Sequence, residues 1–153
     1  MAIEAPISKF RKNNLKIYIV VCLALAFWCI YDAYFNEEFR TKYTEEDGSP
    51  KGWLIFNRNA PIFLFGAALL LAAYHYAIRN KKLIADENEL IISDRKRIPY
   101  DSIQRINKTY FDSKGYFTII YKNKSGREVS YKLDNKAYDN ISAVLDHLVT
   151  EIT

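Results

Sequence analysis

The chain has 153 residues, of which 50% are hydrophobic and 26% are charged, and its formal net charge is +4. From Arg79 onward it holds fourteen Lys and Arg against eleven Asp and Glu, a balance that argues against a nucleic-acid-binding surface. It lacks a glycine-rich phosphate motif and any cluster of Cys and His, so we expect neither a cofactor nor a metal site.

The N-terminal part predicts a basic tail and a first membrane span. Residues 1–16 carry four basic side chains, and residues 17–35, IYIVVCLALAFWCIYDAYF, form an apolar run broken only by Asp32. A basic tail before an apolar run is also typical of a signal peptide. The run is long and aromatic towards its end, and no small-residue cleavage site follows it. We therefore expect a retained transmembrane helix over 17–35.

A second span is predicted over residues 60–78, APIFLFGAALLLAAYHYAI, which carry no formal charge. Nineteen helical residues extend about 28 Å, close to the thickness of the hydrocarbon core of a bilayer. The two spans predict a helical hairpin joined by an extracytoplasmic loop over 36–59, with Gly48-Ser49-Pro50 as its turn. Small residues in both spans suit close packing between the helices, or between copies in a homo-oligomer.

The positions of Lys and Arg predict the orientation of the hairpin. Basic residues stand before the first span and directly after the second, whereas acidic residues outnumber basic ones in the 36–59 loop. Cytoplasmic segments carry the excess of Lys and Arg, so both termini are expected in the cytoplasm. The sequence thus predicts a multi-pass protein of the plasma (inner) membrane.

Two polar side chains in the spans allow a functional interpretation. Asp32 is an acid within an apolar run, where ionisable groups often have a role, but it can also reach the outer interface because it lies three residues from Phe35. His75 lies near the inner boundary, where a neutral imidazole is tolerated. We expect interfacial placement of Asp32 and no proton relay through His75.

Residues 79–153 predict a small cytoplasmic α+β domain. Short apolar runs over 82–86 and 89–93, separated by Glu87-Asn88, indicate a β-hairpin. Pro99 marks a strand edge or a break, and residues 115–122 and 127–133 predict two further paired strands. The expected total is five or six antiparallel strands.

The chain ends in a predicted amphipathic helix. Apolar residues recur at helical spacing along one stripe, at Ile141, Val144, Leu145, Leu148 and Ile152. Asp134 or Asn135 can cap its start. A helix with one apolar face at the end of a small curved sheet is expected to close the open end of that sheet.

The residues of the first strands resemble a known family. LIADENEL over 83–90, followed by RIPYDSI over 97–103, is similar to the opening of bacterial pleckstrin-homology-like (PH-like) domains. The resemblance covers residues 80–151. It implies a curved antiparallel sheet closed by a C-terminal helix, which in bacterial members often follows a pair of membrane spans. Such a scaffold hosts lipid, peptide and protein binding, and the fold alone does not choose among them.

The predicted function is binding rather than catalysis. We expect a membrane-anchored adaptor that engages a protein partner or the lipids of the inner leaflet. The candidate binding residues are basic and lie near the membrane: Lys81, Lys82, Arg95, Lys96 and Arg97. An ordinary solvated turn is the alternative for the 95–97 run. The alternative function is an immunity protein that protects the cell from a toxin acting at the membrane, and a neighbouring toxin gene would favour it.

Overall fold

The computed structural model describes residues 2–93 and 96–152. The chain divides into two compact units. One unit comprises Asn13–Tyr76, and the other is formed by both ends of the chain, Met1–Lys12 and Ala77–Thr153. The first and last residues of the sequence therefore belong to the same unit.

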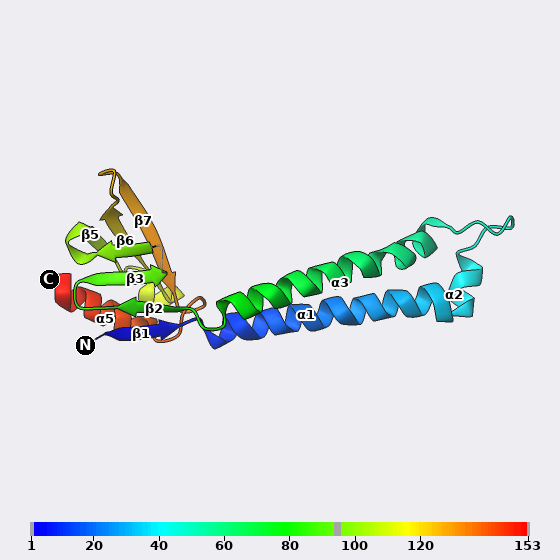
Figure 1. Cartoon of the computed structure of the whole chain (residues 1–153), viewed down its shortest axis with the longest axis horizontal. Coiled ribbons are helices and arrows are strands. Elements are labelled where there is room, and N and C mark those ends of the chain that lie inside the picture. Colours follow the sequence, from blue (N-terminus) through cyan, green and yellow to red (C-terminus); the bar gives the residue numbers. More distant parts are fainter. Residues whose placement is uncertain (1, 94–95, 153) are drawn as a thin grey trace. The chain divides into compact units, whose positions relative to one another are not determined.

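The helical unit is built from two long helices, α1 and α3 (Figure 1). The helix α1 (Lys9–Ile30) continues into a π-helical turn, η1 (Tyr31–Phe35), and a short helix, α2 (Glu37–Lys42), follows. Asn36 caps α2, because its side chain accepts a hydrogen bond from the Phe39 amide at 3.1 Å. The helix α3 (Gly52–Ile78) returns against α1, with the rings of Phe27 and Phe65 in edge-to-face contact at 5.7 Å.

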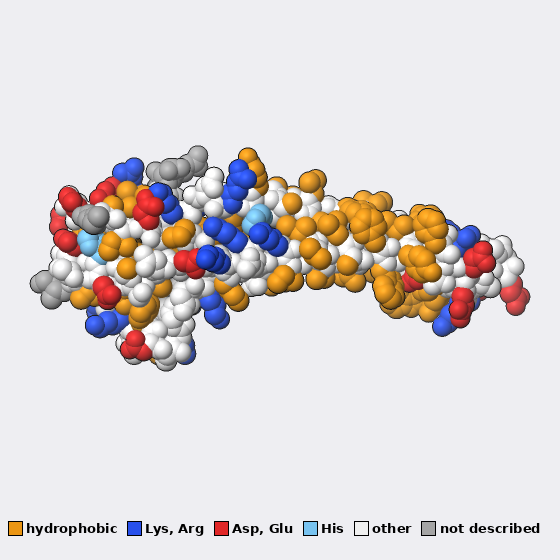
Figure 2. Space-filling view, turned by 90° about the horizontal axis from the view of Figure 1, so that it is seen from below, with side chains coloured by type: hydrophobic (Ala, Val, Ile, Leu, Met, Phe, Trp, Pro, Cys, Tyr) orange, Lys and Arg blue, Asp and Glu red, His pale blue; other side chains and the backbone are white. Residues whose placement is uncertain are grey.

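The surface of the helical unit is strongly apolar (Figure 2). Among the described residues, every exposed large hydrophobic side chain except that of Tyr110 lies on α1, η1 or α3. By length and composition, both helices are able to cross a membrane. A soluble monomer rarely exposes so much contiguous apolar surface.

Both helices extend beyond the apolar runs that predicted them. The helix α1 begins at Lys9 rather than near residue 17, and α3 begins at Gly52 rather than at residue 60. The backbone hydrogen bonds of a helix continue through polar residues, so hydropathy marks the apolar section of a helix but not its ends. Within the predicted 36–59 loop, residues 37–42 and 52–59 are therefore helical.

The second unit contains all seven strands found in the described residues, and six of them lie downstream of the two long helices. The β2–β3 hairpin was predicted, Pro99 ends an edge strand as expected, and all neighbouring strands are antiparallel. These strands are β2 (Lys82–Ala85), β3 (Glu89–Ser93), β4 (Lys96–Pro99), β5 (Ile103–Asn107), β6 (Tyr116–Lys122) and β7 (Glu128–Asp134). The 3-10 turn η2 (Tyr100–Ser102) follows β4, and the short helix α4 (Phe111–Lys114) precedes β6.

The seventh strand, β1 (Ile3–Pro6), comes from the N-terminal segment that was predicted to be a tail. It pairs antiparallel with β2, with Ile3 opposite Ala85 and Pro6 opposite Lys82. It thereby completes a four-stranded sheet in the order β1-β2-β3-β4, beside a three-stranded sheet in the order β5-β6-β7. The side chain of Ala5 is completely buried by this pairing.

Hydrogen bonds also hold Ser8 and Lys9 within the second unit, to which Met1–Lys12 belongs. The buried Ser8 donates its amide to the Ala137 carbonyl at 3.0 Å and its hydroxyl to the Lys136 carbonyl. The same hydroxyl oxygen accepts from the Arg11 amide, so Ser8 is the N-cap of α1. The Asp139 carboxylate accepts from the Lys9 amide at 3.2 Å.

The final helix, α5 (Ile141–Ile152), has the apolar stripe that the sequence predicted. It contacts β1 and β2 and contributes four side chains to the core of the unit. The predicted cap was wrong, because α5 begins after Asn140, whose φ of 59° is left-handed. Residues 135–140 instead form the loop that holds Ser8, and Asp134 accepts a hydrogen bond from the Ala137 amide. The fully buried core side chains include Leu83, Leu90, Ile98, Phe117, Ile119, Leu133, Val144 and Leu148.

One polar contact joins α5 to the β2–β3 turn. The carbonyl of Asp86 accepts a hydrogen bond from the Tyr100 hydroxyl at 2.6 Å and lies 3.0 Å from Nε2 of His147. The His147 side chain is half-buried and lies within hydrogen-bonding distance of this carbonyl.

Alkaline pH should weaken the domain through Tyr100. Burial, with the nearby charges of Glu151 and Asp86, raises the pKa of Tyr100 to about 12. An unfolded tyrosine ionises near pH ~10. Between these values the unfolded chain releases a proton that the folded chain keeps, so the free energy of unfolding falls as pH rises. The loss is at most about 1.4 kcal/mol per pH unit.

Urea unfolding followed by near-UV circular dichroism measures this effect. Tyr131 also has a pKa raised to about 12, chiefly by burial, and contributes to the same pH dependence. The variant Tyr100→Phe should therefore lose only part of the alkaline slope. An unchanged slope would show that Tyr100 does not hold its proton in the folded state.

Candidate functional site

The predicted binding residues Lys81 and Lys82 line a hollow of about 530 Å³ beside the β2–β3 hairpin. Apolar side chains of Ile84 and Ile91 also line this hollow. The ammonium group of Lys82 forms an ion pair with Glu4 on β1. The structure thus brings the two lysines together, but it neutralises one of them.

The predicted basic run does not form one surface among the described residues. Arg95 lies outside the described residues. Arg97 pairs with Glu89 at 2.8 Å, and the ammonium group of Lys96 lies 4.0 Å from the ring centroid of Tyr131. Successive side chains of a β-strand point to opposite faces of the sheet. Lys96 and Arg97 are successive residues of β4, so their side chains lie on opposite faces.

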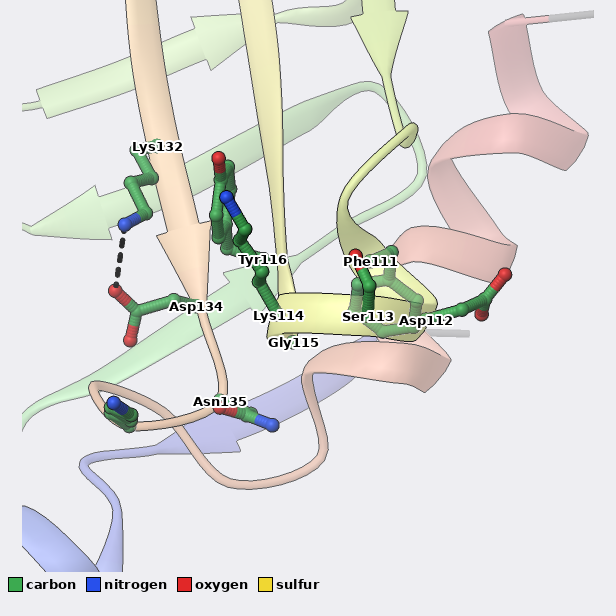
Figure 3. A pocket seen from close by; sticks show the side chains of 10 residues that line it. Phe111, Asp112, Ser113, Lys114, Gly115, Tyr116, Lys132, Asp134 and Asn135 are labelled. Atoms are coloured by element: carbon green, nitrogen blue, oxygen red, sulfur yellow. Dashed lines mark ion pairs between the residues drawn. The ribbon is translucent and has the colours of Figure 1, made fainter.

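A second hollow, which sequence reasoning missed, lies beside α4 at the start of β6 and the end of β7 (Figure 3). Its volume is about 630 Å³. We call it the lysine hollow, because Lys114, Lys132 and Lys136 all line it. Its other lining residues are Phe111, Asp112, Ser113, Gly115, Tyr116, Asp134 and Asn135.

Two aromatic rings organise the lysines of this hollow. The ammonium group of Lys132 lies 4.0 Å from the centroid of the Tyr116 ring, and that of Lys114 lies 4.7 Å from the centroid of the Tyr110 ring. The two rings pack on each other with their centroids 5.6 Å apart. Such contacts hold cationic side chains in place without neutralising their charge.

The backbone at the hollow requires a glycine. Gly115 ends α4 with a φ of 71°, and its carbonyl accepts a hydrogen bond from the Asn135 amide at 2.9 Å. A Cβ atom at position 115 would lie only 2.2 Å from Nδ2 of Asn135. Because Gly115 has no side chain, the side-chain amide of Asn135 can occupy this space.

The two acids of the hollow offset its positive charge only in part. Asp134 lies 3.8 Å from the Lys132 ammonium, but its carboxylate also accepts a hydrogen bond from the Ala137 amide at 2.8 Å. The Asp112 side chain points away from Lys132 (Figure 3). Neither Lys114 nor Lys136 forms an ion pair with a described residue.

The chemistry of the lysine hollow suits an anion with several oxygen atoms. Ammonium groups, the Asn135 amide and the Ser113 hydroxyl all offer hydrogen-bond donors. The sequence gave little sign of this site, because its three lysines are separated by up to 22 positions. They come together only because β6 and β7 pair with Tyr116 opposite Asp134.

Within the helical unit, Asp32 is the buried acid. It is 9% exposed and lies in the π-helical turn η1. Its two carboxylate oxygens accept hydrogen bonds from the Trp28 indole and the Asn36 amide, both at 2.9 Å. Both oxygens therefore have partners, so the hydrogen bonds of Asp32 support a role in ordering the end of the helix.

The described residues contain no group of three or more His, Cys, Asp or Glu side chains that could hold a metal ion. Comparison of the chain with protein-family models, with curated proteins and with solved structures finds no match.

Proposed function

We propose that this protein is a non-enzymatic membrane adaptor of the plasma membrane. In this proposal α1 and α3 span the bilayer as a hairpin, and both chain ends form one cytoplasmic binding domain. The domain engages a protein partner or the lipids of the inner leaflet through its basic surfaces, and a second copy of the chain can pack against the apolar helices.

The pairing of β1 with β2 is the observation that carries the proposal. The strand β1 precedes α1 and β2 follows α3, yet the two strands share backbone hydrogen bonds in one sheet. Paired strands must lie on the same side of a membrane, so an even number of spans has to separate them. Two apolar helices supply that number, and the excess of Lys and Arg flanking them favours the cytoplasmic side.

The strand count supports the PH-like part of the proposal. The sequence downstream of the spans supplies six strands, and β1 supplies another. Two antiparallel sheets of four and three strands, followed by a helix with its apolar face in the shared core, are the parts that a PH-like domain requires. In this interpretation α5 closes the open end between the sheets.

Cysteine labelling in membrane vesicles tests the topology. Cys22 and Cys29 are first replaced by Ser, and single cysteines are introduced as Ser49→Cys or Thr153→Cys. A membrane-impermeant maleimide should label position 153 only from the cytoplasmic side and position 49 only from the opposite side. Labelling of both positions from the same side would contradict the hairpin.

The immunity-protein alternative stays a prediction. It shares the two spans and the cytoplasmic domain, so the geometry described above does not separate it from the adaptor. The neighbouring genes do: an adjacent toxin gene would favour immunity, and an operon with a transporter or an envelope enzyme would favour the adaptor.

A further inference from the structure

The lysine hollow concentrates positive charge that the protein itself only partly neutralises. Three lysines line one hollow, although like charges repel each other. Of the two acids, Asp112 points away from Lys132, and Asp134 pairs with Lys132 at 3.8 Å while its carboxylate also accepts a backbone hydrogen bond. An external anion would relieve this repulsion. By comparison, Lys82 and Arg97 of the predicted basic site each have a glutamate partner.

An exposed aromatic ring stands at the same place. Tyr110 is 44% exposed and is the one large exposed hydrophobic side chain that the described residues place outside the two long helices and η1. It packs on Tyr116, which lines the hollow. Tyrosine rings favour the headgroup zone of a bilayer, where one edge stays apolar and the hydroxyl stays wet.

The hollow is also attached to the residue from which α1 starts. The backbone carbonyl of Lys136 accepts a hydrogen bond from the Ser8 hydroxyl, and Ser8 is the N-cap of α1. Two residues later, Phe10 is 56% exposed among basic neighbours, as expected of a residue at a membrane surface.

From these three observations we propose that the lysine hollow binds the headgroup of an anionic phospholipid. Lys114, Lys132 and Lys136 contact the phosphate, the Asn135 amide donates to its oxygens, and Tyr110 lies in the headgroup zone. This inference rests on the proposed membrane placement and names the lipid-binding site of the same domain. The proposed lipid site therefore differs from the basic residues that the sequence predicted. It lies at the open end of the β6–β7 hairpin, away from the turn that joins the two strands.

Native mass spectrometry of the full chain in uncharged detergent micelles tests this site. The probes are dioleoyl phosphatidylglycerol, which is anionic, and dioleoyl phosphatidylcholine, which is not. The pocket variant combines Lys114→Gln, Lys132→Gln and Lys136→Gln. The matched control combines Lys122→Gln, Lys124→Gln and Arg127→Gln, which remove the same charge from exposed residues at the turn end of the same hairpin.

The pocket variant should bind phosphatidylglycerol more than twentyfold more weakly than wild type, since one basic residue near an anionic surface contributes about fivefold. The control should stay within about threefold of wild type, and phosphatidylcholine should bind all three proteins equally weakly. Equal losses in the pocket variant and the control would overturn the proposal, because binding would then depend on net charge alone. A large loss confined to Lys96→Gln with Arg97→Gln would also overturn it.

Two further arms separate the ligand source and the underlying topology. Glycerol 3-phosphate and inorganic phosphate should compete only at far higher concentrations than the lipid, and competition at equal concentration would identify a free phosphate ligand instead. A detergent micelle does not separate two compartments, so the measurement of lipid binding does not depend on how the protein is oriented in a membrane. A failed pocket test beside a correct labelling pattern would therefore contradict this inference and leave the proposed topology intact.

Discussion

Residues 2–8 joined to residues 80–153 by a short flexible linker should form a soluble domain that unfolds cooperatively, whereas residues 80–153 alone should not. The register places Pro6 opposite Lys82, and the Ile7 amide donates to the Lys81 carbonyl at 3.1 Å, so a tight turn can replace the whole helical hairpin. Without β1, the domain loses the buried side chains of Ala5 and Ile7 and exposes the edge of β2.

The expected loss is large compared with the stability of a small domain. Burying an isoleucine contributes about 2 kcal/mol, and each hydrogen bond of the ladder adds about 1 kcal/mol. The sum approaches the lower end of the roughly 5–15 kcal/mol by which domains are stable.

Thermal unfolding by circular dichroism compares the two chains. A third chain, the linked form with Ala5→Asp, is the control, because it keeps the length and the linker but places a carboxylate in the buried position. It should melt like residues 80–153 alone. Equal melting temperatures for the linked and unlinked chains would show that β1 is dispensable.

The variant Leu145→Asp should unfold the domain while both long helices still insert. Leu145 is 5% exposed and lies midway along the apolar face of α5, against the core that both sheets share. The substitution removes a buried leucine and places a carboxylate without a partner among apolar side chains. The cost is about 4 kcal/mol or more.

Limited proteolysis of the full chain in membranes measures this effect directly. The matched control is Ser142→Asp, an exposed position in the first turn of the same helix, where an acid is slightly favourable. Leu145→Asp should release domain fragments while residues 13–76 stay protected, and Ser142→Asp should resist like wild type. Equal resistance of both variants would contradict the packing of α5.

Local patterns in the sequence predicted much of this fold. The long apolar runs identified both long helices, short runs of apolar and strand-forming residues identified the β2–β3 and β6–β7 hairpins, and the helical stripe identified α5. Each of these signals lies within one element or between neighbours. Their ends were less accurate, because hydrogen bonding extends a helix past the residues that hydropathy selects.

The features that sequence reasoning missed depend on contacts between distant residues. The strand β1 has four residues, ends in a proline and pairs with residues about eighty positions away. The lysine hollow likewise combines residues of α4, β7 and the loop after it. The prediction that Asp134 or Asn135 caps α5 was wrong for the same reason. The loop at 135–140 binds Ser8 through hydrogen bonds, and no local pattern in the sequence indicates a contact with so distant a residue.

The position of β1 also sets an order of events during synthesis. Ribosomes add about 5–20 residues per second, so β1 leaves the ribosome roughly 4–16 s before its partner strand β2 exists. In the proposed topology, that segment must stay unpaired in the cytoplasm while both helices enter the bilayer. Once β2 arrives, its backbone bonds tie the strand made before both helices to the domain made after them. An N-terminus carried across the membrane by mistake could not join the sheet, so only correctly inserted molecules can complete their folding.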